Sequence, residues 1–326
     1  MMMFQTHSDP EQPKKQKKKK QSERPDSSGM LYFILAFVVC LALFAGIGVL
    51  WWKIAKPELP YLNPDASATT TTTSAEPTKP TSRFAATDRF SIAVYITDDR
   101  GALQSVSLCL FKPDSDSISV IALPAELGLP DADTDTLSRR FATGGPESAQ
   151  MALSGYIGKP VDYYAALTYS GVEKYLTALE EPLIVKLPKD IDQQASDGSF
   201  SIHLKEGEQA LSPKQVANLL RCDNWQSGRR ERTNMHAAVV SAYINQFVSE
   251  GRDLTADHTQ LSVNANTNLN NSRFKTIITP LSYLAELRKD LLCTSTHIDG
   301  TFTGAGSTLR FTPGPGVIDT IKSNMK

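Results

Sequence analysis

An uninterrupted apolar segment near the N-terminus constrains this chain more than any other feature. Residues 31–52 form a run of 22 residues, LYFILAFVVCLALFAGIGVLWW, without Asp, Glu, Lys or Arg. As a helix rising about 1.5 Å per residue, the run would reach roughly 33 Å, enough to cross the hydrocarbon core of a bilayer. Trp51 and Trp52 suit one membrane interface and Tyr32 the other. We therefore predict one transmembrane helix at residues 31–52.

Two other interpretations of this segment are a buried helix of a soluble protein and a cleaved signal peptide. Buried soluble helices rarely run so long without a polar face. The apolar region of a signal peptide usually has about 7 to 15 residues and precedes an A-x-A-like cleavage site. This run is longer and ends in Trp-Trp-Lys. The pattern favours an uncleaved signal-anchor.

The charge of the chain is distributed unevenly around the predicted span. The formal net charge is -1, but residues 1–29 carry +3, which comes from the Lys-rich stretch at 14–20. Basic residues stay on the cytoplasmic side of a membrane. We therefore expect residues 1–30 to be a basic cytoplasmic tail and the C-terminal part to be extracytoplasmic, in a single-pass protein of the cell membrane. A Lys run can also bind nucleic acid; beside a span it favours contact with anionic lipids, so we expect a lipid membrane and no nucleic acid as partner.

Residues 53–88 have the composition of a linker, with repeated Pro and a Thr tract at 69–73. Such a Thr/Pro-rich extracytoplasmic segment cannot bury a core and is expected to be extended. Residues 89–326 are long enough to bury one sizeable core. The chain as a whole is 40% hydrophobic and 21% charged, which excludes collagen-like, wholly disordered and disulfide-dense classes.

Alternation of apolar and polar residues predicts several strands in this domain. They are expected at residues 90–96, 106–110, 118–123, 163–167 and 183–187. Apolar residues at helical spacing predict the helices. These are expected at residues 146–157, 170–179, 231–248 and 280–292, with a further helix that starts at Ser212-Pro213 and ends near Arg221. Because strands alternate with helices, we predict an α/β fold, a three-layer α-β-α domain with a mixed central sheet.

Other parts of the domain are less informative. Residues 251–271 are rich in Asn and Thr, and we interpret them as a polar connection. For residues 301–326 we predict a last strand, a turn and a short helix. Cys109, Cys222 and Cys293 follow the span without a C-x-x-C pair, which allows one disulfide and implies no disulfide framework. The histidines show no metal spacing, and His236 is expected to be a surface or packing residue.

The first polar cluster follows the strand at residues 90–96 and reads T-D-D-R-G from Thr97 to Gly101. In open α/β sheets, ligands bind beyond the carboxyl ends of the strands. Asp98 and Asp99 could hold Mg²⁺ there, because this ion takes one or two carboxylates and completes its shell with phosphate oxygens and water. Asp-Asp-Arg-Gly is also ordinary turn chemistry, and the fragment alone leaves both interpretations open.

The second polar cluster contains Arg221 at the end of a helix, followed by Asp223 and by Arg229-Arg230-Glu231-Arg232. Arg229 and Arg232 share a face if the next helix has already begun. Guanidinium groups bind phosphates through paired hydrogen bonds, which suits a pyrophosphate. The alternative is a solvated surface on which these arginines pair with Asp223 and Glu231.

Five segments of the domain occur in the order of the motifs of one known family. Residues 90–100, FSIAVYITDDR, are similar to a first strand with its G-x-D-x-R turn, and residues 107–124 to the paired strands that lead into S-x-P-R-D. Residues 161–172, with V-D-Y-Y and S-G-V, are similar to a V-D-H/Y-Y segment and the helix after it.

Two later segments continue the pattern. Residues 207–212, GEQALS, resemble G-x-Q-x-L-(S/D/N)-G, and the two clusters at residues 218–221 and 229–232 resemble Y-x-R-x-R…R-x-x-R-Q. In this order, and behind a basic tail and a single span, these motifs resemble the LytR-CpsA-Psr (LCP) family of bacterial envelope proteins.

The resemblance implies a function in cell-wall glycopolymer attachment. Members of the family bind a polyprenyl-pyrophosphate-linked glycan and transfer it to a peptidoglycan hydroxyl through a phosphodiester bond. An apolar pocket takes the lipid, and acidic residues coordinate Mg²⁺. Carried over to this chain, the resemblance makes Asp98 and Arg100 the catalytic turn and Asp98 with Asp99 the metal side. It makes Arg221, Arg229 and Arg232 the residues that face the pyrophosphate.

The chain departs from the family pattern at four positions of the implied site. The second acidic residue falls on or near Gln104, and the Arg of S-x-P-R-D is Ala125. The second Arg of R-x-R is Asp223, and the final Gln is Thr233. Loss of charged donors at a phosphoryl-transfer centre can lower the rate by several powers of ten. Two hypotheses therefore remain: a glycopolymer phosphotransferase with a partly degenerate site, and a non-catalytic envelope binding or regulatory module on the same fold.

Overall fold

The computed structural model describes residues 83–130, 134–250, 253–287 and 293–325, which belong to one compact unit, Glu76–Lys326. The predicted tail, the predicted span and residues 53–82 of the predicted linker lie outside the described residues. Within the part of the chain that is described, no helix has the length and apolar character needed to cross a bilayer.

A mixed six-stranded sheet forms the centre of the domain, in the order β10-β3-β2-β1-β4-β9. Its strands are β1 (Phe90–Thr97), β2 (Leu103–Lys112), β3 (Ser117–Pro124), β4 (Tyr163–Thr168), β9 (Asn266–Thr267) and β10 (Ser295–His297). β2 pairs antiparallel with β1 and with β3, whereas β4 pairs parallel with β1. The carboxyl ends of β1, β3 and β4 therefore meet at one edge of the sheet. The predicted α/β fold with a mixed central sheet is confirmed.

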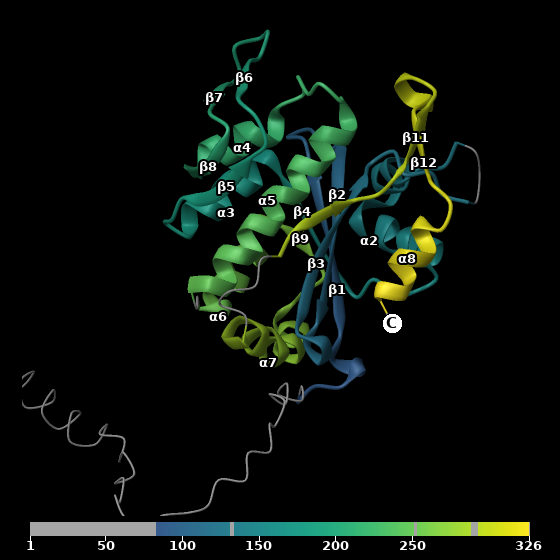
Figure 1. Ribbon diagram of the computed structural model, residues 1–326, viewed down its shortest axis with the longest axis vertical. Coiled ribbons are helices and arrows are strands. Elements are labelled where there is room, and N and C mark those ends of the chain that lie inside the picture. The colour runs from purple at the N-terminus through teal and green to yellow at the C-terminus, as the bar shows by residue number, and fades with distance from the viewer. Residues whose placement is uncertain (1–82, 131–133, 251–252, 288–292, 326) are drawn as a thin grey trace, which may run out of the picture. The chain divides into compact units, whose positions relative to one another are not determined.

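Helices cover both faces of this sheet (Figure 1). The seven helices of the described residues are α2 (Leu137–Ile157), α3 (Tyr169–Ala178), α4 (Pro213–Arg221), α5 (Arg229–Glu250), α6 (Leu254–Asn264), α7 (Asn271–Leu287) and α8 (Val317–Asn324). Alternate residues of β1 explain the layers. Ala93 and Tyr95 pack in the cluster that contains α2 and α8, whereas Ile96 packs in the cluster that contains α3, α4 and α5.

Three two-stranded sheets lie outside the central one. β5 (Leu183–Leu187) pairs with β8 (Gly207–Leu211), β6 (Ile191–Gln194) with β7 (Ser201–Leu204), and β11 (Gly300–Thr303) with β12 (Arg310–Pro313), all antiparallel. The C-terminal stretch was predicted as one strand before a turn and a short helix. It contains a hairpin and then α8.

One predicted helix start was wrong, and one helix has an extension that was not predicted. Element α2 joins two helical segments across a kink at Gly144 and Gly145, where Gly145 has a positive φ of 70°, so the helix predicted from residue 146 starts as expected. The segment before the kink begins at Leu137, where Thr136 caps it by accepting a hydrogen bond from the Arg139 N–H. The helix predicted to begin at Pro280 begins at Asn271 and contains Pro280 in its interior.

The polar connection at residues 251–271 contains structure that the sequence analysis missed. Asp253 caps α6, accepting hydrogen bonds from the N–H groups of Thr255 and Ala256. Strand β9 follows and pairs with β4. Near the N-terminal end of the described residues, the Phe84 ring packs edge-to-face against Tyr283 of α7, with ring centroids 4.7 Å apart. The last residues of the predicted linker therefore already pack on the domain.

Candidate functional site

The turn after β1 stands at the edge where three strands end. A register irregularity follows Ile96, and Thr97 Oγ1 donates to the Leu167 carbonyl at the end of β4. Asp98 Oδ1 then accepts hydrogen bonds from the N–H groups of Arg100, at 3.0 Å, and Ala102, at 2.8 Å. Gly101 closes the turn with a φ of 87°, which glycine adopts readily. The turn interpretation is therefore correct for the backbone, and Asp98 helps to shape it.

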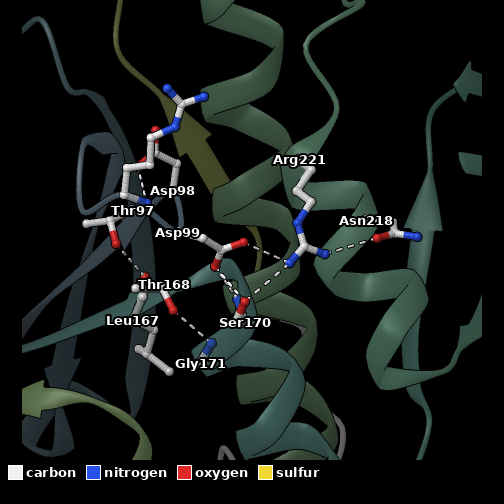
Figure 2. Close-up of polar contacts among 10 residues, drawn as sticks. Thr97, Asp98, Asp99, Leu167, Thr168, Ser170, Gly171, Asn218 and Arg221 are labelled. Atoms are coloured by element: carbon white, nitrogen blue, oxygen red, sulfur yellow. Dashed lines mark hydrogen bonds and ion pairs between the residues drawn. The ribbon is translucent and has the colours of Figure 1, made fainter. Parts of the chain in front are cut away.

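Asp99 points out of the same turn toward α3 and α4 (Figure 2). Its Oδ1 accepts from the N–H of Ser170 at 2.8 Å and from the Ser170 hydroxyl at 2.7 Å. Its Oδ2 accepts from Arg221 Nη2 at 3.0 Å. Ser170 lies in the first turn of α3, where unpaired N–H groups and the helix dipole favour a negative charge. Both polar clusters of the sequence are thus joined by one carboxylate.

Local sequence explains how Arg221 reaches this position. Ser212 caps α4 and forms a capping box with Gln215, which fixes where the helix starts. Arg221 is therefore the last helical residue, and its Nη1 donates to Asn218 Oδ1 one turn earlier at 3.0 Å. The guanidinium carbon lies 5.7 Å from the centre of the Tyr169 ring.

The electrostatics of these groups show that they share one environment. Burial pushes the pKa of Asp99 upward, but the hydrogen bonds from Ser170 and the contact with Arg221 outweigh it and hold the pKa below its ordinary value. Burial raises the pKa of Tyr169 to about 12, and the charges that modify it are those of Arg232, Asp98, Arg221 and Asp99. The charges of four predicted site residues therefore act on the same tyrosine.

The remaining predicted site residues are placed differently. Arg229 forms an ion pair with Glu126, at the end of β3, rather than with Asp98 or Asp99. Arg232 lies one turn further along α5, and its buried Nε has no hydrogen-bond partner among the described residues. Arg100 is exposed. The pKa of Asp197 is lowered first by hydrogen bonding from Ser199 and further by the charge of Arg100, which places Arg100 toward the β6–β7 turn.

The loop between α4 and α5 is held by side chains of β6 and its approach. Gln193 Nε2 donates to Asp223 Oδ1 at 2.5 Å, and the side-chain oxygen Oε1 of Gln193 accepts from the N–H groups of Asp223 and Asn224. The ion pair between Lys189 and Glu231 adds a second tie at 2.6 Å. Asp223 is thus occupied by Gln193. Glu231, which one interpretation paired with the arginines of its own cluster, pairs with Lys189.

A deep apolar cavity lies beneath this edge, between the sheet and helices α3, α5, α6 and α7. Its volume is about 200 Å³, and its lining includes Ile96 of β1, Leu176 of α3 and Val239 of α5. Leu220 and His236 also line it. Leu220 directly precedes Arg221 on α4, and His236 lies one turn after Arg232 on α5, so the cavity extends to residues next to the arginine cluster.

Several residues of this site were missed by sequence reasoning. Tyr169 and Ser170 become part of it because β4 ends beside β1, which only the pairing of the sheet shows. Glu126 falls within the segment that resembles S-x-P-R-D, so the motif could have identified it as the partner of Arg229. His236 was expected to be a surface or packing residue, and the structure buries it completely.

The donor set fits Mg²⁺ only through a single carboxylate. Both oxygens of Asp99 accept hydrogen bonds from Ser170 and Arg221, whereas Asp98 Oδ2 has one long contact, 3.4 Å from Gln104 Nε2. Among the described residues no group of three or more His, Cys, Asp or Glu could hold a metal. A Mg²⁺ ion that takes most of its ligands from phosphate and water needs no more than Asp98.

Comparison with solved structures finds the same fold in bacterial proteins. A protein from Eubacterium siraeum superposes with a TM-score of 0.64 at 14% identity, covering 79% of this chain and 98% of that chain. TagV of B. subtilis gives a TM-score of 0.60 at 16% identity, covering 73% and 95%. TagT bound to LI-WTA gives 0.54 at 15% identity, covering 74% and 91%. At these identities the likeness shows the fold alone.

Sequence comparison supplies the family. No curated protein sequence matches the chain. The family model described as LytR_cpsA_psr family matches residues 61–303, which is well over half of the chain and includes both polar clusters. The chain therefore belongs to the LytR-CpsA-Psr family.

Proposed function

We propose that this protein is anchored in the cell membrane by residues 31–52, with its folded domain outside the cell, and binds a polyprenyl-pyrophosphate-linked glycan during cell-wall glycopolymer attachment. One observation carries the proposal: the lining of the apolar cavity includes Leu220, which directly precedes Arg221, and His236, which lies one helical turn after Arg232. A long apolar tail joined to a doubly charged head needs both environments in contact.

The cavity suits the lipid tail. Its walls are mostly aliphatic and aromatic side chains from five helices and the sheet, and a chain of isoprene units gains free energy when it leaves water for such a lining. A site that bound only a soluble sugar phosphate would gain nothing from this cavity. The lining therefore favours a lipid-linked substrate over a free one.

The arginines suit the pyrophosphate. The buried Nε of Arg232 has no hydrogen-bond partner in the part of the protein that the structure describes, and a phosphate oxygen would supply one. Arg221 is held by Asp99 and Asn218, which presents its guanidinium at a set position. Arg229, which forms an ion pair with Glu126, would add a further guanidinium contact to the pyrophosphate while it keeps this partner. TagT, which has the same fold, is described as bound to LI-WTA, and this supports a glycopolymer carrier as ligand.

Transfer would require a peptidoglycan hydroxyl to attack the phosphorus that carries the glycan. The new P–O bond would form as the phosphoanhydride bond breaks, and polyprenyl phosphate would leave. Asp98 is the candidate acceptor for the hydroxyl proton and the candidate carboxylate for Mg²⁺, which would neutralise phosphate charge. Arg100, in the same turn, would contribute positive charge on the solvent side.

A second candidate function is a non-catalytic binding or regulatory module. Ala125 occupies the position that the resemblance assigns to a catalytic Arg, and it is 1% exposed. Asp223 replaces a second Arg and is held by Gln193. Both substitutions remove positive charge from the transition state and leave the lipid cavity intact.

Binding is tested with the full chain in detergent micelles, titrated with a polyprenyl pyrophosphate with and without Mg²⁺. We expect saturable binding and a loss of about tenfold or more for Arg221→Ala, since one charge-assisted contact is removed. Arg139→Ala, an exposed residue at the start of α2, is the matched control and should bind normally. Absence of binding by the unaltered chain, or equal binding by Arg221→Ala, contradicts the proposal. Glycan transfer to peptidoglycan then separates the enzyme from the binding module.

A further inference from the structure

A buried histidine lies where the apolar cavity meets the arginine cluster. His236 of α5 is 0% exposed and lines the cavity together with Leu220. Its Nδ1 lies 2.7 Å from the Ser105 hydroxyl of β2, and its Nε2 lies 2.9 Å from the Leu220 carbonyl oxygen of α4. One imidazole ring therefore joins the sheet, α4 and α5.

The partners of the ring determine its tautomer. A carbonyl oxygen can only accept, so Nε2 carries the hydrogen and donates to Leu220, and Nδ1 accepts from the Ser105 hydroxyl. Both nitrogens are satisfied by the neutral ring. Burial and the nearby charge of Arg232 lower the pKa of His236 to about 3, which keeps the ring neutral in this role.

The hydrogen bond to Leu220 acts on the end of α4. The last carbonyls of a helix have no partner within the helix, and His236 supplies one directly before Arg221. The imidazole ring also stands edge-on to the Tyr169 ring, with ring centroids 6.3 Å apart. The guanidinium carbon of Arg221 lies 5.7 Å from the centroid of the same Tyr169 ring. Both the backbone before Arg221 and the ring beneath its guanidinium are thus held by His236.

We propose that His236 is a positioning residue, which holds Arg221 at the point where the head of a lipid pyrophosphate meets its tail. This inference rests on the proposed function, since it assumes that Arg221 faces the pyrophosphate. His236 acts through Arg221 and Tyr169 and does not transfer a proton. Its loss should therefore weaken recognition of the charged head and leave recognition of the tail unchanged.

The test compares two ligands and two variants of the full chain in detergent micelles, by calorimetric titration at neutral pH. Farnesyl pyrophosphate carries head and tail, whereas farnesol carries the tail with an uncharged hydroxyl. His236→Gln places an amide N–H near the position of Nε2, where it can still donate to Leu220. His236→Asn places its amide near Nδ1, where it can meet Ser105 but not Leu220. Circular dichroism confirms that each variant is folded.

We expect the preference for farnesyl pyrophosphate over farnesol to fall about tenfold in His236→Asn and to change less than threefold in His236→Gln, with farnesol affinity equal in all three proteins. An unchanged preference in His236→Asn, or a parallel loss of both ligands, overturns the positioning role. If the unaltered chain shows no preference, the proposed function fails first. Should His236→Asn not fold, Ser105→Ala replaces it, because the ring then loses the hydroxyl that holds Nδ1 against β2. An unchanged preference in Ser105→Ala also overturns the inference.

Discussion

Asp99 and Arg221 lie 122 residues apart in the chain, and Asp99 Oδ2 accepts a hydrogen bond from Arg221 Nη2 at 3.0 Å. The pair joins the turn after β1 to the end of α4, and Ser170 of α3 completes it through two bonds to Asp99 Oδ1. Three elements that are distant in sequence are therefore held together at the edge of the sheet. The arrangement fixes a guanidinium directly after Leu220, a residue that lines the apolar cavity.

A double-mutant cycle with Asp99→Ala and Arg221→Ala measures the interaction free energy between these two side chains. The side chain of Asp99 is 43% exposed and that of Arg221 20%, so solvent screens the interaction. We expect a coupling free energy of about 0.5 to 1 kcal/mol from urea unfolding, smaller at high salt. Asp98→Ala with Arg221→Ala serves as control and should show little coupling. Equal coupling for both pairs would mean that Asp99 has no special role.

The stability of the domain should depend on pH through His236. In the unfolded chain this histidine takes up a proton near pH 6.5, whereas burial in the folded protein lowers its pKa to about 3. The contribution of His236 to the free energy of unfolding is therefore fully present above about pH 6.5. It is lost as pH falls toward 3, by up to about 1.4 kcal/mol per pH unit. His236→Gln removes this contribution. Denaturant unfolding at pH 7 and pH 5 should show a smaller difference for the variant than for the unaltered chain; equal differences would argue against a neutral buried ring.

Restoring the two arginines of the family pattern should cost very different amounts of stability. Ala125 is 1% exposed, so Ala125→Arg forces a charged side chain into a packed position and should cost about 2 to 4 kcal/mol in free energy of unfolding. Asp223 is exposed, and Asp223→Arg should cost less than about 1 kcal/mol. Because it exchanges a negative for a positive charge beside the arginines, it should also strengthen pyrophosphate binding. Thermal unfolding and ligand titration check both points, and a stable Ala125→Arg protein would refute the packing argument.

Filling the cavity should block the lipid tail irrespective of its head group. Val239→Phe adds volume at a residue that is 5% exposed and lines the cavity, at a stability cost of about 1 to 3 kcal/mol. We expect weaker binding of farnesol and of farnesyl pyrophosphate alike. Val263→Phe, at a position that is 76% exposed, is the matched control and should bind both normally. Normal binding by the Val239 variant would place the tail elsewhere.

Much of the fold follows from local patterns in the sequence. Alternating residues mark β1, β2 and β3, and the Ser212-Pro213 start marks α4 to the residue. These features depend on neighbours in the chain, which is why sequence alone suffices for them. Pro280 was taken as a helix start because proline disfavours helix interiors. α7 nevertheless continues through it. The helix packs against α5, and its apolar residues share a core cluster with residues of β2 and β3.

The site was harder to predict than the fold, because neighbouring side chains of a turn point in different directions. The resemblance placed the active carboxylate at Asp98 and treated Asp99 as a second metal ligand. In the structure Asp98 Oδ1 caps its own turn, and Asp99 reaches Arg221. Spacing along the chain contains no information about which of two adjacent side chains faces α4. The partner of Arg229, Glu126, depends likewise on the parallel direction of β3 and β1.

The central claim is that the apolar cavity and the arginine cluster hold one ligand together. Its most direct test is photocrosslinking of the full chain with a polyprenyl pyrophosphate that carries a diazirine on its tail, followed by mass spectrometry of the labelled peptides. The account predicts adducts on cavity residues of α3 and α5, such as Leu176 and Val239, that unlabelled farnesyl pyrophosphate removes by competition and that Arg221→Ala reduces. Adducts confined to the surface of the domain, or cavity adducts that persist unchanged in Arg221→Ala, would contradict it.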